Sequence, residues 1–428
     1  MTKWEGKKIT IFGLGKSGAA IASKLVPLKA SITLTDTSKE EKLNPQLVQE
    51  MKNLGVKLEL GGHTNDSVLN TELIIMSPGV HLDLPVLTEA RKKGIPIISE
   101  IEAAFRFLVK PIIAITGTNG KTTTATLVYE FLKAGGKKVA LAGNIGNPLI
   151  TVNDEDLDFI VVELSSYQLE SIVAFRPWIS LILNISEDHL ERHKNMDEYI
   201  KTKGKIFENQ KRTDYLIYNA EDKLVSKLVE GADAKLVPFS KDTCFIDPRG
   251  MLIPGKHNLE NALAAAQAAL LAGVSSETIK KVLSEFKGVE HRIEFVREKS
   301  GVKYYNDSKG TNPNSTIIAL KALNRGTGNV ILIAGGKDKG GDLTELASQI
   351  NKTTKAVFLI GESASRFQAA FKNINAVACT SLEEAVKKAA DLSREKDIVL
   401  LSPACASFDM FASYEDRGRR FKELVAAL

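Results

Sequence analysis

Short apolar runs alternate with amphipathic stretches along the whole chain. Runs of strand length end in turns that contain glycine or a polar side chain, as at residues 8–12, 112–115, 158–163, 329–336 and 397–403. Helical patterns, with apolar residues three and four positions apart, follow many of these turns. Because strands that alternate with helical stretches of this length form parallel sheets, the chain is predicted to be an α/β protein.

Three domains are predicted from the length and from this pattern. The chain of 428 residues is long enough for about three domains of ordinary size. We expect an N-terminal Rossmann-like domain at residues 1–99 and a central mononucleotide-binding α/β domain of the P-loop type at 100–297. A C-terminal Rossmann-like α/β domain is expected at 298–428.

Composition and charge narrow the class of protein. Hydrophobic residues make up 43% of the chain and charged residues 25%, which is typical of a globular protein with ample core. The net charge of +5, from 57 basic and 52 acidic residues, is well short of a nucleic-acid-binding profile but suits anionic small molecules. We expect small-molecule substrates, no nucleic-acid partner and a monomer.

The cysteines and the apolar runs indicate a cytoplasmic protein. Cys244, Cys379 and Cys405 lie far apart with no C-x-x-C pair, which argues against a disulfide framework and fits a reducing compartment. A strand begins within the first ten residues, so no signal peptide is expected. No apolar run approaches the roughly 20 residues that span a bilayer, and we expect no membrane insertion.

The first glycine-rich loop lies between a strand at 8–12 and a helical pattern. Its sequence, Gly13-Leu14-Gly15-Lys16-Ser17-Gly18, is G-x-G-x-x-G, and Asp36 ends the next strand about 20 residues on, as in a dinucleotide fingerprint. This pattern places a pyrophosphate on the helix N-terminus and lets Asp36 or Thr37 reach a ribose or sugar. NAD, FAD and a UDP-sugar all meet this description, and glycines with a purely structural role are the alternative.

The second loop carries the stronger signal. Its sequence, Thr116-Gly117-Thr118-Asn119-Gly120-Lys121-Thr122, follows an apolar strand and precedes an amphipathic helix. In such a loop the amides and the helix N-terminus hold phosphate, the lysine reaches the terminal phosphates and the Thr122 hydroxyl ligates Mg²⁺. The full pattern, G-x-x-x-x-G-K-[ST], has glycine where Ile115 stands, and an ordinary turn is the alternative. We predict an ATP site.

Polar side chains follow the neighbouring strands of the central domain. Glu163 ends the strand at 158–163, a position that supplies a second Mg²⁺ contact in nucleotide-binding folds, although a solvent-facing glutamate is the alternative. His189 and His193, four residues apart, could share a helix face and bind zinc, but no third ligand is evident. His189 is better placed at the active site, in the row of Lys121 and Glu163.

Three further stretches leave their roles open. Residues 196–207 form a basic helical stretch, and spacing alone does not single out one of its lysines. Asn258 and Asn261 lie on one helix face; a helix cap would explain Asn258, and the two amides together suit a base edge. Lysines and hydroxyls gather at strand ends of the last domain, which suits a carboxylate substrate, with a scatter of loop lysines as the alternative.

Five motifs together resemble one family. They occur in order at residues 116–122, 163–166, 184–190, 257–262 and 307–312. This set resembles the Mur ligases, the ATP-dependent amino-acid ligases of peptidoglycan synthesis, in which the phosphate loop normally lacks its first glycine. Residues 13–18 and 401–409 are similar to the branch of this family that adds D-glutamate.

The resemblance implies a binding site for the UDP part of a substrate in the first domain. Its residues would be Leu14, Gly15, Lys16, Ser17, Asp36, Thr37, Ser77, Pro78 and Gly79. Asn144, Gln168 and His189 would lie nearer the reacting end of the substrate. D-Glutamate would be held by Lys309, Thr311, Lys339, Ser407, Phe408 and Tyr414.

The resemblance also implies the ATP and metal sites. ATP would contact Gly117, Thr118, Asn119, Gly120, Lys121, Thr122, Thr123, Asn258, Asn261, Arg292 and Asp307. Two Mg²⁺ ions would be held by Thr122 and Glu163, and by His189 with Lys203. The family carries a carbamate at the position of Lys203, which offers Mg²⁺ anionic oxygens where an ammonium would repel it.

The implied reaction is phosphoryl transfer from ATP to the terminal carboxylate of UDP-N-acetylmuramoyl-L-alanine, followed by attack of the D-glutamate amine on the acyl phosphate. Its catalytic residues would be Lys121, Glu163, His189, Lys203 and Lys309. Two other classes of protein are the alternatives. An NAD-dependent oxidoreductase would use the first loop but leave the second unexplained, and a non-catalytic regulator would use ATP as a switch.

Overall fold

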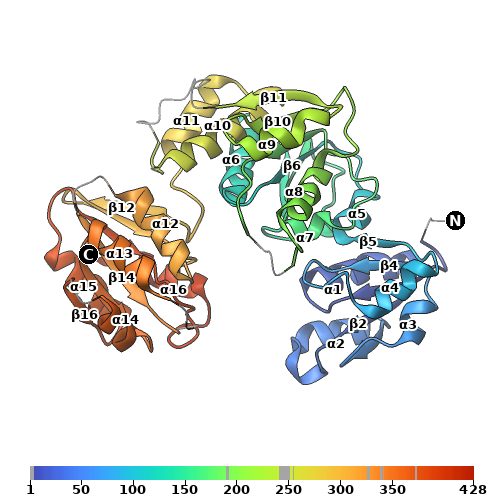
Figure 1. Cartoon of the computed structure of the whole chain (residues 1–428), viewed down its shortest axis with the longest axis horizontal. Helices are drawn as coiled ribbons and strands as arrows, with labels where there is room; N and C mark the ends of the chain where they lie inside the picture. Colours follow the sequence, from blue (N-terminus) through green and yellow to red (C-terminus); the bar gives the residue numbers. More distant parts are fainter. Residues whose placement is uncertain are drawn as a thin grey trace. The chain divides into compact units, whose positions relative to one another are not determined.

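The structure is a computed structural model that describes residues 4–188, 192–240, 251–253, 255–324, 328–337, 340, 342–371 and 374–428. The chain forms two compact units, one from residues 1–245 and 260–279 and the other from residues 246–259 and 280–428. Figure 1 follows the chain from its N-terminal strands in blue to its C-terminal helix in red.

The N-terminal part of the first unit is a parallel sheet with the strand order β3-β2-β1-β4-β5. Its strands are β1 (Lys8–Phe12), β2 (Ser31–Asp36), β3 (Lys57–Leu60), β4 (Leu73–Met76) and β5 (Ile97–Ser99). Its helices are α1 (Lys16–Leu25), α2 (Pro45–Asn53), α3 (Asn65–Leu69), α4 (Pro85–Lys92) and α5 (Glu100–Phe105). The chain reverses its direction across the sheet between β1 and β4, so the crevice beyond their carboxyl ends is the expected ligand site.

The second sheet of this unit is also parallel, in the order β11-β10-β9-β6-β8-β7. Its strands are β6 (Ile112–Thr116), β7 (Val139–Gly143), β8 (Phe159–Glu163), β9 (Ile179–Ile182), β10 (Tyr215–Asn219) and β11 (Lys235–Phe239). The helices between them are α6 (Lys121–Ala134), α7 (Ser166–Leu169), α8 (Met196–Gly204) and α9 (Lys223–Leu228). Every residue of β6 is buried, as expected of a central parallel strand covered on both faces.

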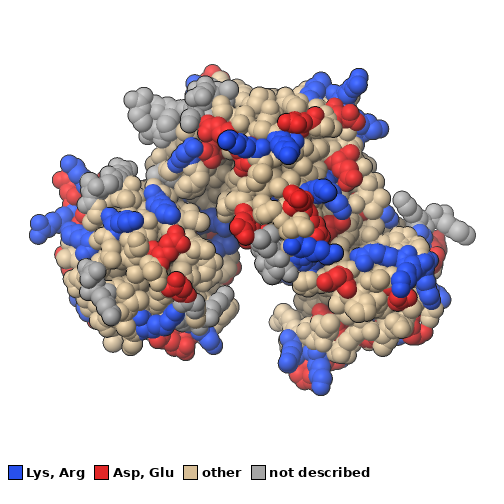
Figure 2. Space-filling model, viewed as in Figure 1, with Lys and Arg blue, Asp and Glu red and all other residues tan. Residues whose placement is uncertain are grey.

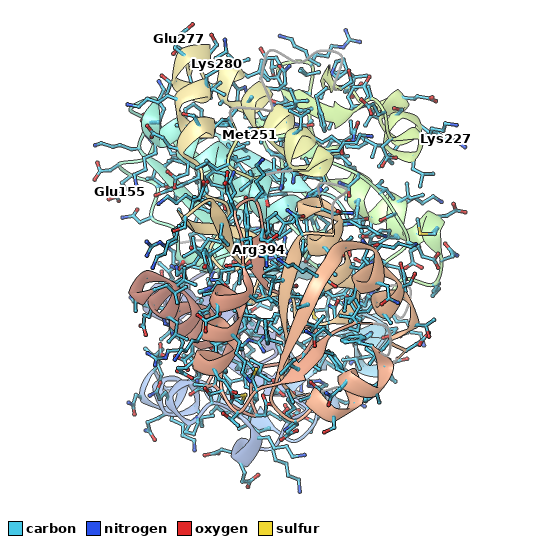
Figure 3. All side chains as sticks on the ribbon, turned by 90° about the vertical axis from the view of Figure 1, so that its left-hand side faces the viewer. Glu155, Lys227, Met251, Glu277, Lys280 and Arg394 are labelled. Carbon is cyan, nitrogen blue, oxygen red and sulfur yellow. The ribbon has the colours of Figure 1, made fainter. Side chains whose placement is uncertain are left out.

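Two helices follow this sheet along the chain, α10 (Lys256–Leu271) and α11 (Ser276–Glu285). Small alanines fill most of the buried positions of α10, which permits close packing. In α11, Ile279 is buried, whereas Glu277 and Lys280 are exposed and their side chains point outward in Figure 3. The two helices are therefore held by their apolar faces.

The C-terminal sheet has the order β12-β13-β17-β14-β15-β16. Its strands are β12 (Glu294–Lys299), β13 (Val302–Asn306), β14 (Val330–Gly335), β15 (Thr354–Ile360), β16 (Ala376–Ala378) and β17 (Ile398–Leu401). Its helices are α12 (Pro313–Leu323), α13 (Thr344–Thr353), α14 (Ala364–Ala370), α15 (Leu382–Leu392) and α16 (Tyr414–Ala427). Alternate residues of β14 enter two cores, Leu332 with α12 to α14 and Ile331 with α15 and α16, so helices cover both faces of this sheet.

The α/β class with Rossmann-like and mononucleotide-binding sheets is confirmed. The expectation of parallel sheets is wrong at one edge, because β12 pairs antiparallel with β13. A short turn joins these two strands, which permits only an antiparallel pair. The predicted boundary at 297/298 falls inside β12, and the one at 99/100 falls between β5 and α5; both boundaries stay predictions.

The surface carries both signs of charge. On the face shown in Figure 2, basic and acidic side chains are interspersed rather than gathered by sign. Within the described ranges, no helix is long and apolar enough to cross a membrane.

Candidate active site

The first glycine-rich loop joins β1 to α1 and leaves an open helix N-terminus. Helix α1 has no side-chain cap and no acidic residue in its first turn, so its first N–H groups can hold an anion. A Cβ at Gly18 would overlap the carbonyl oxygen of Gly13, whereas a Cβ at Gly15 would meet no atom within 4 Å. Gly18 is therefore needed for packing, while the protein itself does not require glycine at position 15.

A small pocket of about 170 Å³ lies beside this loop. It is lined by Gly13, Asp36, Thr37, His63, Gly79, Val80, His81 and Leu84. The pocket therefore brings three of the predicted UDP-substrate residues together, Asp36, Thr37 and Gly79. The other predicted residues of this set lie in the same loop, at the start of α1 and in the turn after β4.

Asp36 holds two loops together as well as facing the pocket. Its Oδ2 accepts a hydrogen bond from the Leu14 N–H at 2.8 Å, and its Oδ1 accepts one from the Ser38 N–H at 2.7 Å. The Ser77 hydroxyl donates to the Gly13 carbonyl at 3.2 Å. Because a carboxylate oxygen accepts more than one hydrogen bond, Asp36 can do this and still bind a sugar hydroxyl.

His63 is a pocket residue that the sequence did not indicate. Its Nδ1 lies 2.8 Å from the Thr35 hydroxyl, and its ring packs on Phe12 with centroids 4.6 Å apart. Burial lowers the pKa of His63 below its ordinary value. It follows β3, a strand whose short polar pattern gave no signal.

The second loop joins β6 to α6, and Lys121 is the first residue of that helix. Gly120 has a φ of +84°, and a Cβ there would overlap the Asn261 side chain. Only glycine fits this position. The Lys121 ammonium donates to the carbonyls of Gly117 at 2.9 Å and Thr118 at 2.8 Å, so it lies folded over the loop that would cradle the phosphates.

The segment after β9 holds this loop in shape. The Thr118 N–H donates to the Asn184 carbonyl at 2.9 Å, and the Asn119 N–H donates to Asn184 Oδ1 at 2.8 Å. The Thr118 hydroxyl lies 3.1 Å from the Tyr199 hydroxyl. Asn184 and Tyr199 are positioning residues that sequence reasoning missed, because neither has a spacing that distinguishes it from ordinary strand and helix residues.

Glu163 lies beside the loop with one oxygen unpaired. It is 1% exposed and opposite Ile115 in the pairing of β8 with β6. Its Oε1 accepts from Asn144 Nδ2 at 2.8 Å, whereas its buried Oε2 has no hydrogen-bond partner among the described residues. A buried carboxylate oxygen without a donor is suited to a cation. Thr122, buried in the first turn of α6, supplies a hydroxyl from the same end of the sheet.

No group of three or more His, Cys, Asp or Glu side chains suited to a metal occurs among the described residues. The donor set at the loop is instead a carboxylate and a hydroxyl, the oxygen ligands that Mg²⁺ prefers. His189, the predicted ligand of a second ion, lies outside the described residues.

Lys203 is the lysine of α8 that the structure singles out. It is 1% exposed, and its ammonium donates to the Gly117 carbonyl at 2.8 Å, the same oxygen that Lys121 contacts. Burial, and then repulsion from Lys121, lower the pKa of Lys203 to about 7, with Asp188 opposing the shift. Lys201, two residues away, is exposed. The structure thus separates lysines that spacing could not.

Gln168 and Asn144 hold local structure near Glu163. The side-chain Oε1 of Gln168 accepts from the Ser165 N–H at 3.0 Å, and the Ser165 hydroxyl accepts from the main-chain N–H of Gln168 at 3.3 Å. This capping box begins α7. Both predicted substrate residues are therefore engaged by the protein, Asn144 with the Glu163 carboxylate and Gln168 with its own helix.

In the second unit, Asp307, Lys309 and Thr311 follow β13, and Ser407 and Phe408 follow β17. Asp307 accepts from the Ser402 hydroxyl at 2.6 Å and from the Ile293 N–H at 3.2 Å, and burial raises its pKa to about 7. The Lys309 ammonium lies 5.8 Å from the centre of the Tyr414 ring. The structure thus brings these two predicted D-glutamate residues together.

For other residues predicted to bind ATP or D-glutamate, the structure gives only their exposure to solvent. Ser407 and Asn258 are buried, whereas Phe408 is 70% exposed. Arg292 and Thr311 are half-buried. Lys339 lies outside the described residues.

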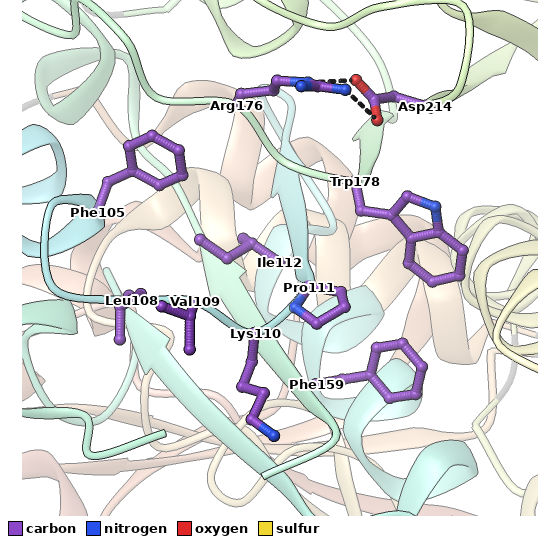
Figure 4. A pocket seen from close by; sticks show the side chains of 10 residues that line it. All are labelled: Phe105, Leu108, Val109, Lys110, Pro111, Ile112, Phe159, Arg176, Trp178 and Asp214. Carbon is purple, nitrogen blue, oxygen red and sulfur yellow. Dashed lines mark hydrogen bonds and ion pairs between the residues drawn. The ribbon is translucent and has the colours of Figure 1, made fainter. Parts of the chain in front are cut away.

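A larger pocket, of about 570 Å³, lies away from the loops. It is lined by Phe105, Leu108, Val109, Lys110, Pro111, Ile112, Phe159, Arg176, Trp178 and Asp214 and is drawn in Figure 4. Ile112 and Phe159 begin β6 and β8, whereas the phosphate loop follows the opposite end of β6. Arg176 is paired with Asp214 at 2.7 Å. This pocket does not belong to the candidate site.

Family models match three stretches of the chain. Residues 7–99 match the model described as Mur ligase MurD-like, N-terminal domain, and residues 115–246 match Mur ligase middle domain. Residues 291–405 match Mur ligase, glutamate ligase domain. These stretches correspond to the three sheets.

Curated relatives match over almost the full length. The protein named UDP-N-acetylmuramoylalanine--D-glutamate ligase in Thermoanaerobacter sp. (strain X514) is 43% identical and covers 99% of both chains. Its namesake in Clostridioides difficile (strain 630) is 43% identical over 98% of both chains. That of Koribacter versatilis is 43% identical over 98% of this chain and 97% of its own.

Solved structures share the fold at lower identity. UDP-N-acetylmuramate-alanine ligase MurC of Thermotoga maritima is 22% identical with a TM-score of 0.57, covering 98% of this chain and 99% of that one. MurF of Acinetobacter baumannii is 18% identical with a TM-score of 0.59, covering 92% and 91%. With relatives 43% identical over nearly its whole length, the chain belongs to the Mur ligase family.

Proposed function

We propose that this chain is an ATP-dependent ligase that joins D-glutamate to UDP-N-acetylmuramoyl-L-alanine in peptidoglycan precursor synthesis. The likeness that carries the proposal is 43% identity over 99% of both chains to a relative named for this activity. The site agrees in kind, because it combines an open loop suited to a pyrophosphate with a lysine-bearing phosphate loop beside a buried carboxylate.

The reaction has two steps. A carboxylate oxygen of UDP-N-acetylmuramoyl-L-alanine attacks the γ-phosphorus of ATP, the bond to the bridging oxygen breaks, and ADP leaves. The amine of D-glutamate then attacks the carbonyl carbon of the acyl phosphate, phosphate leaves with the electrons of the C–O bond, and the nitrogen loses a proton. Lys121 and the loop N–H groups stabilise the negative charge that spreads over the transferring phosphoryl group.

Thr122 and Glu163 would hold one Mg²⁺ ion, and His189 with Lys203 would hold a second. Bound Mg²⁺ neutralises phosphate charge and aligns the phosphates for transfer. The unpaired Oε2 of Glu163 supports the first of these assignments.

Lys203 would serve as a carbamate. A neutral amine reacts with CO₂, loses a proton and becomes an anionic carbamate. A pKa of about 7 leaves a large neutral fraction near neutral pH, when an ordinary lysine has almost none. The carbamate would also replace the repulsion between Lys203 and Lys121 with attraction.

The substrates would divide among the three predicted domains. The loop after β1, Asp36, Thr37 and the turn after β4 would bind the UDP part, with Asn144, Gln168 and His189 nearer the reacting carboxylate. Asn258, Asn261, Arg292 and Asp307 would surround the nucleoside of ATP. D-Glutamate would be held by Lys309, Thr311, Lys339, Ser407, Phe408 and Tyr414. The enzyme would act as a monomer in the cytoplasm, where the nucleotide-linked precursor and ATP are found.

The proposal is tested by phosphate release from ATP in the presence of UDP-N-acetylmuramoyl-L-alanine, with and without D-glutamate. We expect sustained release only when both substrates are present, together with a product whose mass increases by one glutamate residue. Release that ignores D-glutamate would contradict the ligase activity. A spectral change of added NADH would support the oxidoreductase alternative instead.

A further inference from the structure

Arg417 is a fully buried arginine whose guanidinium donates hydrogen bonds to main-chain carbonyls and a hydroxyl. It lies in the N-terminal part of α16 and is 0% exposed. Its Nε donates to the Ser308 hydroxyl at 3.0 Å and its Nη2 to the Ser308 carbonyl at 2.9 Å. Nη2 also donates to the Cys405 carbonyl at 3.1 Å, and Nη1 donates to the Ala406 carbonyl at 3.3 Å.

These contacts join two segments that each carry predicted D-glutamate residues. Ser308 precedes Lys309 in the loop after β13, and Ala406 precedes Ser407 in the loop after β17. Both loops are buried at these points, so their carbonyls need donors. A single planar group satisfies both loops and fixes the spacing between them.

Other contacts link the same loops to the helix that carries Arg417. The Ser308 hydroxyl donates to the Tyr414 carbonyl at 2.8 Å, and Tyr414 packs near Lys309. The Lys337 N–H donates to the Ala406 carbonyl at 2.9 Å, so the loop after β14 is held to the same segment. Arg417 thus lies at the junction of the loops that end β13, β14 and β17.

The charge of Arg417 is not matched by a carboxylate within ion-pair distance among the described residues. Burial lowers its pKa to about 10, with Cys405, Asp409 and Asp307 opposing the shift at longer range, and it stays charged at neutral pH. It also lies near a helix N-terminus, where a cation is unfavourable. Burying an unpaired charge is costly, and packing alone would be served better by an apolar side chain. The arrangement is explained if the two loops must be held at a fixed spacing to bind an anionic ligand.

We propose that Arg417 is a positioning residue for the amino-acid substrate, which holds the loops of Lys309 and Ser407 at the spacing that D-glutamate requires. The inference rests on the proposed function. Its effect should fall on the second step of the reaction, which needs D-glutamate, and spare the first step, which does not.

The test uses the full-length protein and two readouts. The first is kcat and KM for D-glutamate in the complete reaction. The second is formation of the acyl phosphate without D-glutamate, captured as a hydroxamate by hydroxylamine. The variants are Arg417→Lys, which keeps the charge but loses the planar fork, and Ser308→Ala, which removes the hydroxyl that accepts from Arg417 Nε and donates to the Tyr414 carbonyl. Arg420→Gln is the matched control, since Arg420 lies on the same helix but is exposed and paired with Glu383 and Glu423.

We expect Arg417→Lys to lower kcat/KM for D-glutamate by about 10²-fold, the cost of a misplacement near 1 Å. Hydroxamate formation per folded enzyme should stay close to that of the wild type. Ser308→Ala should change the same quantities in the same direction by less, and Arg420→Gln should change neither.

Three results would overturn the inference. Normal kinetics in Arg417→Lys, with a loss in Ser308→Ala, would show that the planar fork of arginine is not required for positioning. Equal loss of both readouts, in step with the folded fraction measured by thermal unfolding, would leave Arg417 a purely structural role. Normal kinetics with D-glutamate in both variants would remove any role. Absence of hydroxamate from the wild-type protein would instead overturn the proposed ligase, and this inference with it.

Discussion

The two glycine-rich loops of the first unit have the same local plan and different surroundings. Each joins a buried parallel strand to a helix that begins with lysine, has no side-chain cap and has no acidic residue in its first turn. At the first loop, Gly15 meets no neighbouring atom and the nearby charge is the Asp36 carboxylate. At the second, Gly120 packs on Asn261, and two lysines bind one carbonyl.

The difference indicates which ligand each loop suits. An open main chain beside a carboxylate fits a pyrophosphate with sugar hydroxyls, because the acid accepts their hydrogen bonds. A packed loop beneath two cations and a buried acid fits a triphosphate with its metal ion. A helix N-terminus alone attracts either ligand, so the side chains around it determine which ligand the loop binds.

The largest effect on turnover is expected from removing Lys203, the buried lysine beside the second loop. Lys203→Ala should abolish measurable turnover, because the proposed metal ligand is lost, and added formate or acetate should partly restore it. Lys201→Ala, an exposed change on the same helix, should leave the rate near that of the wild type. Turnover by Lys203→Ala without any added carboxylate would contradict the proposed role.

The next test of the comparison replaces the lysine that begins each helix, Lys121 in α6 and Lys16 in α1. Lys121→Ala should lower kcat by at least about 10²–10³, the typical cost of removing one preorganised transition-state donor. Lys16→Ala, at the same position of the other loop, should leave kcat nearly unchanged and raise KM for the UDP substrate. Steady-state kinetics with each substrate varied in turn measures both. Equal effects of the two changes on kcat would break the comparison.

Replacing Gly15 should have a smaller effect on the kinetics, but it tests the ligand of the first loop more specifically. Because its φ is −103° and no atom lies nearby, Gly15→Ala should leave the thermal unfolding temperature unchanged. A methyl group at the pyrophosphate should raise KM for the UDP substrate about tenfold or more. Gly18→Ala is the control, since its Cβ would overlap the Gly13 carbonyl and should destabilise the fold by about 1–3 kcal/mol. An unchanged KM in Gly15→Ala would show that the ligand lies elsewhere.

The smallest expected effect is the change in carbamate occupancy at Lys203 with pH. The neutral amine is the form that reacts with CO₂, and with a pKa of about 7 it predominates above pH 7 and is lost as the pH falls below it. Carbamate occupancy, measured by NMR with isotopically labelled bicarbonate, should therefore decrease from pH 8 to pH 6. A free amine at Lys203 in the wild-type enzyme during turnover would contradict the carbamate.

The sequence predicted the strands that frame both loops because those strands are long, apolar and followed by glycine. It did not indicate β3, β10, β11, β12 or β16. Of these, β16 has three residues, and most positions of β11 are exposed, so neither carries a strong apolar pattern. Strand β12 pairs with β13 through a hairpin, and the spacing of apolar residues does not indicate a hairpin.

The site was predicted where chemistry is local in sequence and missed where it depends on packing. Lys121 could be inferred from the loop motif after β6, and Glu163 because it ends the buried strand β8. Lys203 could be chosen among its neighbours only through the family resemblance, since burial and the contact with Gly117 arise from tertiary structure. Tyr199 and Arg417 gave no signal for the same reason.

The most direct test of the central claim is ligand binding to two single variants. Calorimetric titration with UDP and with a non-hydrolysable ATP analogue in the presence of Mg²⁺ would be made on the wild type, Gly15→Ala and Lys121→Ala. We expect Gly15→Ala to weaken binding of UDP and leave binding of the ATP analogue unchanged, and Lys121→Ala to do the reverse. If either variant weakened both ligands equally, or if the pattern were exchanged, the assignment of the two loops would be wrong.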